Sequence, residues 1–225
     1  QHEEIQISLI IEGEGTLIVG DTVNSYKKGD VFGIGSNIPH VFKSDIKVTK
    51  TSHMLTLFFT RTSFGVDFFE LEELKEIQAF FQRCKNGFKI QSDNNVVINL
   101  FNQLETASKF SQLIIMLQLL KVLAKTEYKP LSSFVYDKKY TDNEGKRMRD
   151  VFEYSMNHFT QEISLDAISK VANMTRNAFC KYFKKRTNKT YFQFLTELRV
   201  DHACKLIIKN KESSIASIAE QSGYN

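Results

Sequence analysis

The segment from Ile163 to Asn225 limits the fold of this chain more than any other feature. It predicts a short helix, a tight turn, a basic helix, a long helix and the start of another short helix. Ser164 is suited to cap the first helix, Leu165 to Val171, because its hydroxyl can accept a hydrogen bond from a free N–H of the first turn. Asn173 tolerates the left-handed backbone that such a turn often requires. The pattern is typical of two consecutive helix–turn–helix motifs.

The second helix of this segment begins after Thr175 and continues to about Arg186, with Phe179 and Phe183 on its inner side. It contains five basic residues and no acid. Short or polar side chains near the start of such a helix can reach base edges, whereas lysine and arginine neutralise phosphates. An isolated basic helix is more often an ordinary solvated helix, and the flanking motif is what favours DNA. The expected DNA-binding residues are Thr175, Arg176, Asn177, Cys180, Lys181, Lys184 and Lys185, with Asn177, Cys180 and Lys181 facing the bases and Arg176 and Lys184 facing the backbone.

The charge of the chain is unevenly distributed. Residues 145–225 contain 14 lysines and arginines against 8 acids, whereas the rest of the chain is slightly acidic. This excess is expected of a segment that approaches phosphate. The three cysteines are isolated, which indicates a reducing compartment such as the cytoplasm. The chain begins with Gln1 rather than Met, so its natural N-terminus is left open.

The first sixty residues have the period of β-strands. Ile5, Ile7 and Leu9 alternate with more polar residues, and turns are expected at Gly20-Asp21 and around Gly29. Further short strands are expected at residues 31–34, 40–42 and 54–59. Short strands at this spacing favour a small antiparallel β-barrel or sandwich.

Helical spacing replaces this alternation after residue 70. Helices are predicted over about 71–87 and 96–125, the second with an interruption near Ser108. A polar linker follows at 131–143, and Thr141 and Glu144 fit a capping box that opens a new helix. The predicted fold class is α+β with two domains. Residues 1–130 are expected to form one domain, a barrel with a helical pair, and residues 144–225 an all-α domain that binds DNA.

The C-terminal segment resembles the AraC/XylS family of bacterial transcription regulators over residues 146–225. The resemblance depends on matching residues in both motifs and in the helix between them, while Ser169 and Asn188 depart from the usual Ala and Gly. The matching residues are Ser164, Leu165, Ile168, Phe179, Phe183, Lys184, Arg199, Ala203, Leu206, Ser214, Ile215, Ile218, Ala219, Gly223 and Tyr224. It implies two motifs that read successive segments of the major groove, with the second recognition helix starting after Asn225.

The N-terminal pattern resembles the cupin-type effector domain of this family over Glu4 to Gly15, at Gly29-Asp30 and at Pro39-His40. In cupin enzymes two His, a Glu and a later His bind a metal. Here His2 and His40 could take two of these places, but Gln6 replaces the Glu and is a poor ligand for transition metals. We therefore expect no metal, no cofactor and no enzymatic activity. The expected effector-binding residues are Gln6, Ser8, Phe32 and His40.

The resemblance implies a sequence-specific transcriptional regulator controlled by a small molecule such as a sugar or another metabolite. Its expected partners are double-stranded DNA, the effector and a second copy of the chain, joined through the 96–125 helix, with RNA polymerase as a further candidate. Two alternatives stay open. One is a metal-dependent cupin enzyme fused to a DNA-binding domain, and the other is a ligand-free barrel that only dimerises. The sequence leaves the effector, the operator and the sign of regulation undetermined.

Overall fold

The alternating residues at the start of the chain form antiparallel sheets, as predicted. The computed structural model describes residues 2–45, 49–91, 95–133, 135, 142–209 and 212–224. The chain forms two compact units whose segments alternate along the sequence. Unit 1 comprises Gln1–Gly15, Tyr26–Ile38 and Ser44–Lys138, and unit 2 comprises Thr16–Ser25, Pro39–Lys43 and Lys139–Asn225. The domain boundaries predicted from the sequence stay a prediction, since much of the 131–143 linker, including the proposed cap Thr141, lies outside the described residues.

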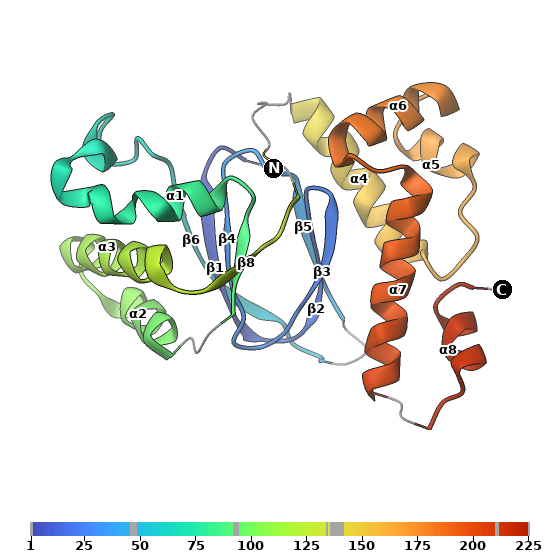
Figure 1. Ribbon diagram of the computed structural model, residues 1–225, viewed down its shortest axis with the longest axis horizontal. Helices are drawn as coiled ribbons and strands as arrows, with labels where there is room; N and C mark the ends of the chain where they lie inside the picture. The colour runs from blue at the N-terminus through green and yellow to red at the C-terminus, as the bar shows by residue number, and fades with distance from the viewer. Residues whose placement is uncertain are drawn as a thin grey trace. The chain divides into compact units, whose positions relative to one another are not determined.

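Unit 1 contains a five-stranded antiparallel sheet in the order β6–β1–β4–β7–β8 (Figure 1). Its strands are β1 (Ile5–Glu12), β4 (Val31–Ile34), β6 (His53–Phe59), β7 (Phe88–Ile90) and β8 (Tyr128–Pro130). The register pairs Ile7 with Leu57, and it pairs Ser8 with both Phe32 and Thr56. Because successive side chains point to opposite faces of a sheet, Ile7 and Leu57 share one face and Ser8, Phe32 and Thr56 share the other. Strands β7 and β8 were not predicted, because three residues are too few to show an alternation.

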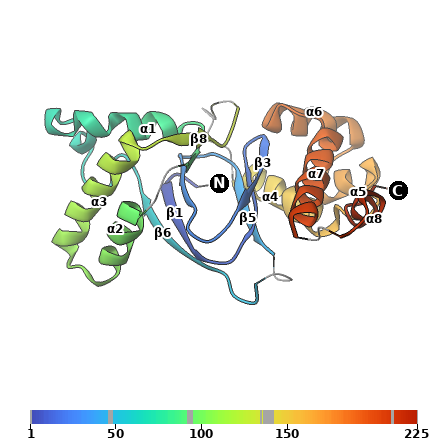
Figure 2. The same ribbon diagram turned by 60° about the horizontal axis from the view of Figure 1, so that its bottom comes forward.

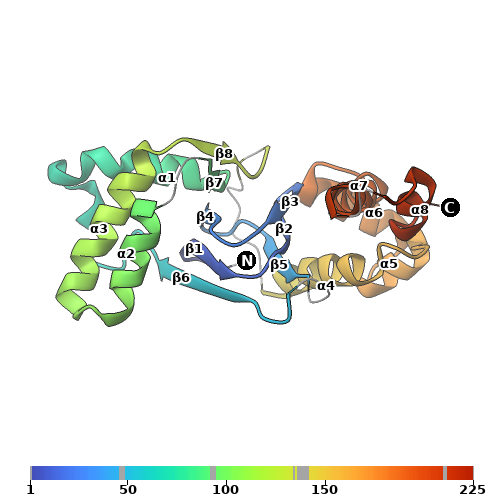
Figure 3. The ribbon, with the colours of Figure 1, turned by 90° about the horizontal axis from the view of Figure 1, so that it is seen from below.

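The two helices predicted over 71–87 and 96–125 were wrong as single helices, because each segment forms more than one helix. The first segment forms two 3₁₀ helices, η1 (Phe68–Glu70) and η2 (Glu72–Ile77), followed by the short α1 (Gln78–Cys84). The second forms α2 (Asn95–Thr106) and α3 (Lys109–Lys125), which lie side by side (Figures 1 and 3). The break falls at Ser108, because its hydroxyl accepts a hydrogen bond from a backbone N–H at 3.3 Å and starts a new helix there. The interruption suggested by the sequence is therefore confirmed.

The helices of unit 1 pack on the face of the sheet that carries Ile7. Figure 2 shows α1 and α3 on the same side of this sheet. The fit depends on glycine, since a Cβ added to Gly33 would lie 2.3 Å from the Phe88 ring and one added to Gly35 would lie 2.3 Å from the Cys84 carbonyl oxygen. The largest side chains buried in this core are phenylalanines and leucines, namely Phe69, Phe80, Phe88, Leu119, Leu120 and Leu123.

Unit 2 combines a three-stranded sheet with a group of helices. The sheet has the order β3–β2–β5, and its strands are β2 (Gly15–Val19), β3 (Thr22–Tyr26) and β5 (His40–Ser44). The helices are α4 (Asp142–His158), α5 (Leu165–Val171), α6 (Arg176–Thr187), α7 (Tyr191–Lys209) and α8 (Ile215–Gln221). In Figure 1, α7 starts beside α6 and ends beside α8, and it contacts both. Within the described parts of the chain, no helix is long and apolar enough to cross a membrane.

Candidate nucleic-acid interface

The helix–turn–helix predicted around Asn173 is confirmed. Ser164 caps α5 and Thr175 caps α6, and each hydroxyl accepts a hydrogen bond from the backbone N–H three residues later, at 3.1 and 3.4 Å. Asn173 in the turn and Asn188 at the end of α6 both have a φ of 55°, a left-handed conformation that asparagine tolerates better than most residues. Ser164 therefore marks the start of α5, and Thr175 and Asn188 mark the start and the end of α6.

The inner side of α6 is held by aromatic packing. Phe179 and Phe183 are fully buried, and the centroid of each ring lies 5.5 Å from that of Tyr191 on α7. Edge-to-face pairs of this kind contribute about 0.5–1.5 kcal/mol each beyond burial. The Tyr191 hydroxyl lies 2.9 Å from Oγ of Ser155, and burial raises the pKa of Tyr191 to about 12. The hydroxyl is therefore neutral at physiological pH, and the inner side of α6 packs against uncharged aromatic side chains.

The outer side of α6 carries uncompensated positive charge. All seven residues predicted to bind DNA are exposed, namely Thr175, Arg176, Asn177, Cys180, Lys181, Lys184 and Lys185. Among the described residues, Lys181, Lys184 and Lys185 have no ion-pair partner. The helix itself contains no acid that could neutralise them. A surface of this kind attracts an anionic polymer and can release the counterions of its phosphates.

Arg176 differs from these lysines because a carboxylate already holds it. Its Nε and Nη2 donate to the two carboxylate oxygens of Asp166 on α5. This bond lowers the pKa of Asp166 and raises that of Arg176. A phosphate would therefore have to displace a carboxylate before Arg176 could bind it. The sequence did not reveal this pair, because its members belong to different helices.

Arg186, the last of the five basic residues on α6, is structural. Its side chain is 3% exposed, its Nη2 lies 2.6 Å from Oε1 of Glu144, and its guanidinium lies 5.0 Å from the Tyr182 ring centroid. Helical spacing could have identified it, since Arg186 follows the buried Phe183 by three residues and so returns to the inner side. Of the five basic residues of α6, three lysines have no ion pair among the described residues, Arg176 is paired with Asp166, and Arg186 is buried.

The second motif is joined to the first through Arg199 of α7. Its Nε donates to the carbonyl oxygen of Phe159 at 2.8 Å, and its Nη2 donates to that of Gln161 at 2.9 Å. Gly223, after α8, has a φ of +85°, and a Cβ there would lie 2.7 Å from the same Phe159 oxygen. Arg199 and Gly223 therefore hold the end of α8 against the residues that follow α4.

Three of the four predicted effector-binding residues share one face of the five-stranded sheet. Gln6 is 4% exposed, and Ser8 and Phe32 are fully buried. Gln6 Nε2 donates to Ser8 Oγ at 2.8 Å, and this hydroxyl lies 3.0 Å from Oγ1 of Thr56. His40 belongs to unit 2, where it is half-buried on β5. The effector-binding role of these residues stays a prediction.

The residues considered as metal ligands form hydrogen bonds instead. His2 Nε2 lies 3.2 Å from Oε1 of Gln6, the residue that replaces the expected glutamate. The other ring nitrogen, Nδ1, lies 2.9 Å from the carbonyl oxygen of Glu4. In the part of the chain that the structure describes, no three His, Cys, Asp or Glu side chains come together as a set that could hold a metal ion.

Comparisons with known proteins agree with the helix–turn–helix geometry. A family model described as a helix-turn-helix domain matches residues 168–225. The uncharacterized HTH-type transcriptional regulator YdeC of Bacillus subtilis (strain 168) is 28% identical over 79 residues, which are 35% of this chain and 27% of that protein. The chain thus spans about a quarter of that relative. The Msm operon regulatory protein of Streptococcus mutans is 21% identical over 224 residues, covering 97% of this chain and 75% of that protein.

A likeness also exists to a solved structure, the AraC-like transcriptional activator CuxR. It has a TM-score of 0.38 and 10% identity, and it covers 98% of this chain and 72% of that one. The two relatives named above are regulators, so the alternative of a metal-dependent enzyme is not favoured. The family model covers residues 168–225, and one regulator aligns along 97% of the chain. These findings support the resemblance of the chain to the AraC/XylS family of transcriptional regulators.

Proposed function

We propose that the exposed side of α6 reads operator DNA in a sequence-specific way. The observation that carries this proposal is the contrast between the two sides of the helix. Its phenylalanines are fully buried, whereas Lys181, Lys184 and Lys185 are exposed and have no ion-pair partner among the described residues. A helix that is anchored on one side and positively charged on the other is suited to lie in the major groove.

The residues of this side have different tasks. Asn177, Cys180 and Lys181 lie in the first half of α6. In our proposal they contact base edges, which distinguish all four base pairs in the major groove. Lys184 and Lys185 lie in the last turn and are placed to contact phosphates. Thr175 orients the helix, because its hydroxyl is engaged in the cap. Arg176 becomes a phosphate contact only when it leaves Asp166.

Affinity measurements on sequences selected from a random duplex library test this division. Asn177→Ala and Lys181→Ala should each weaken binding to the selected sequence by about 1–3 kcal/mol. Each variant should also lose the preference for one base at one position of that sequence. Lys184→Ala should weaken binding to selected and scrambled duplexes alike. It should also make the slope of log K against log salt concentration shallower by about one. Lys85→Ala, which removes an exposed lysine of unit 1, is the control. Equal losses on selected and scrambled DNA for all three α6 variants would contradict the assignment of the base-reading residues.

We also propose that a small-molecule effector, such as a sugar or another metabolite, controls this regulator. Gln6, Ser8 and Phe32 support the proposal because they are buried on one face and two of them are polar. His40 completes the predicted set. To change DNA binding, the effector must bind one arrangement of the protein better than another.

The proposed assembly is a homodimer that acts in the cytoplasm, where it meets DNA and can contact RNA polymerase. Its support is an apolar strip on α3, where Phe110 is 73% exposed and Ile114, one helical turn later, is 43% exposed. Side chains four residues apart lie on the same side of a helix. A second copy of α3 could cover this strip and place two DNA-binding units on neighbouring half-sites.

A further inference from the structure

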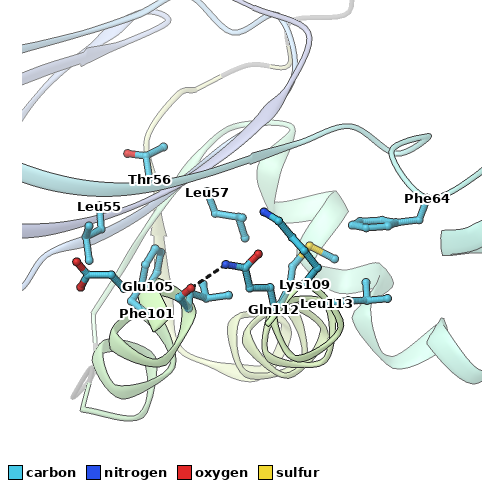
Figure 4. Close-up of a pocket in the computed structure, with 11 residues that line it drawn as sticks. Leu55, Thr56, Leu57, Phe64, Phe101, Glu105, Lys109, Gln112 and Leu113 are labelled. Carbon is cyan, nitrogen blue, oxygen red and sulfur yellow. Dashed lines mark hydrogen bonds between the residues drawn. The ribbon is translucent and has the colours of Figure 1, made fainter. Parts of the chain in front are cut away.

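A pocket lies in unit 1 between β6 and the helices α2 and α3 (Figure 4). Its volume is about 460 Å³, within the range of roughly 300–1,000 Å³ that is usual for small-molecule sites. The walls are mainly apolar, with Leu55 and Leu57 from β6, Phe101 and Leu104 from α2, and Leu113 and Met116 from α3. Such a pocket favours a ligand with a hydrophobic body.

This pocket is separate from the face that carries the predicted effector-binding residues. Leu57 pairs with Ile7 in the sheet, and both lie on the face that the helices cover. Thr56 pairs with Ser8, and the two hydroxyl oxygens lie 3.0 Å apart. In Figure 4 the Thr56 side chain points away from the helices. Ligands on the two faces would therefore contact different side chains, and the two sites can be tested independently.

The positive charge at the pocket comes from Lys109, and Glu105 brings a negative charge to the same lining. The Lys109 side chain is exposed and forms no ion pair within the described residues. Lys109 is also the first residue of α3, a helix of 17 residues whose first turn contains no acid. The positive end of the helix dipole makes this an unfavourable place for a cation unless an anion is close. Lys109 and the start of α3 together form a positive spot, and no described side chain forms an ion pair with Lys109.

The other polar residues around the pocket restrict the ligand further. Gln112 is held in place, since its Nε2 donates to the Leu104 carbonyl oxygen at 3.0 Å. Glu105 is exposed and unpaired among the described residues, and Figure 4 shows its carboxylate and the Lys109 ammonium on opposite sides of Gln112. Glu105 would repel a second negative charge on the ligand. A ligand with one negative charge is therefore favoured over a dianion.

We propose that this pocket binds a hydrophobic carboxylic acid. The apolar chain or ring lies against the leucines and Phe101, and the carboxylate pairs with Lys109. Any effect of this ligand on assembly rests on the proposed function, because the outer side of α3 carries the proposed dimer strip of Phe110 and Ile114. Binding of the acid does not depend on that proposal.

The test is calorimetric titration of the 225-residue chain with three ligands of equal chain length, namely sodium octanoate, 1-octanol and octylamine. Octanoate should bind best and octylamine worst. Lys109→Met should weaken octanoate roughly two- to fivefold, the effect of one exposed ion pair, and leave octanol unchanged. Glu105→Gln should strengthen octanoate by a similar factor. Lys85→Met, which removes an exposed lysine outside the pocket, should change nothing.

A variant that fills the pocket tests the location of the site. Leu113→Trp should weaken all three ligands, and Leu104→Trp replaces it if that protein does not fold. Equal binding of octanoate and octylamine, or unchanged octanoate binding by Lys109→Met, would overturn the role of the charge. If both tryptophan variants bind the three ligands as tightly as the wild type, the ligands do not bind in this pocket. DNA affinity without ligand is measured on the same proteins, so failure of this site is distinguishable from failure of the DNA-binding proposal.

Discussion

Replacing Asp166 by asparagine should increase the affinity of this regulator for DNA of any sequence. In the free protein both carboxylate oxygens of Asp166 accept hydrogen bonds from the Arg176 guanidinium. Asparagine keeps the size of the side chain but removes the charge that holds Arg176. The guanidinium, at the start of the exposed side of α6, then becomes available to a phosphate.

The magnitude follows from the release of counterions. One additional phosphate contact makes the plot of log K against log salt concentration steeper by about 0.9. Over a fourfold rise in salt, the variant should therefore lose about 3.5-fold more affinity than the wild type. Stability should change little, because both side chains of the pair are half exposed and such pairs are weak in water.

The assay is fluorescence anisotropy with a random-sequence duplex at several salt concentrations. Glu153→Gln is the matched control, since it removes one exposed negative charge from α4 and changes the net charge of the protein equally. A salt slope for Asp166→Asn that equals the wild-type slope would refute the release of Arg176. An equal steepening by Glu153→Gln would show that net charge, and not this ion pair, is responsible.

Two further predictions concern stability and assembly. Burial raises the pKa of Tyr191 to about 12, above its value of about 10 in the unfolded chain, so the neutral hydroxyl stabilises the folded state fully below pH 10. This contribution, about 3 kcal/mol, should be lost as pH rises from 10 to 12, and urea unfolding of Tyr191→Phe should show a smaller decline over that range. Phe110→Glu should raise the dissociation constant of the dimer in sedimentation velocity, because this side chain is 73% exposed in the single chain and belongs to the proposed strip. A dimer of unchanged affinity would contradict the proposed strip.

Local signals were enough to predict the helix–turn–helix. The hydroxyls of Ser164 and Thr175 and the left-handed Asn173 and Asn188 act within a few residues of their own positions. Such interactions can be read from neighbouring letters of the sequence. The strands near the N-terminus were predicted for a similar reason, because an apolar alternation as long as that of Ile5–Glu12 identifies a strand without knowledge of its partner.

Pairing between distant segments could not be read in this way. The three-residue strands β7 and β8 exist only because β4 and then β7 provide their hydrogen-bonding partners. The segment before α1 shows the spacing of an α-helix, yet it forms the 3₁₀ helices η1 and η2. The pocket beside Lys109 is likewise formed by segments that are far apart along the chain.

The sequence by itself determined the caps and turns of the helix–turn–helix motif and the strands near the N-terminus. Only the tertiary structure decided which charges of α6 are available. It pairs Arg176 with Asp166 of α5 and buries Arg186 against Glu144 of α4, and it leaves the three lysines exposed. The physical reason is that a charge is neutralised by whatever lies within a few ångströms in space, whereas the sequence orders residues only along the chain.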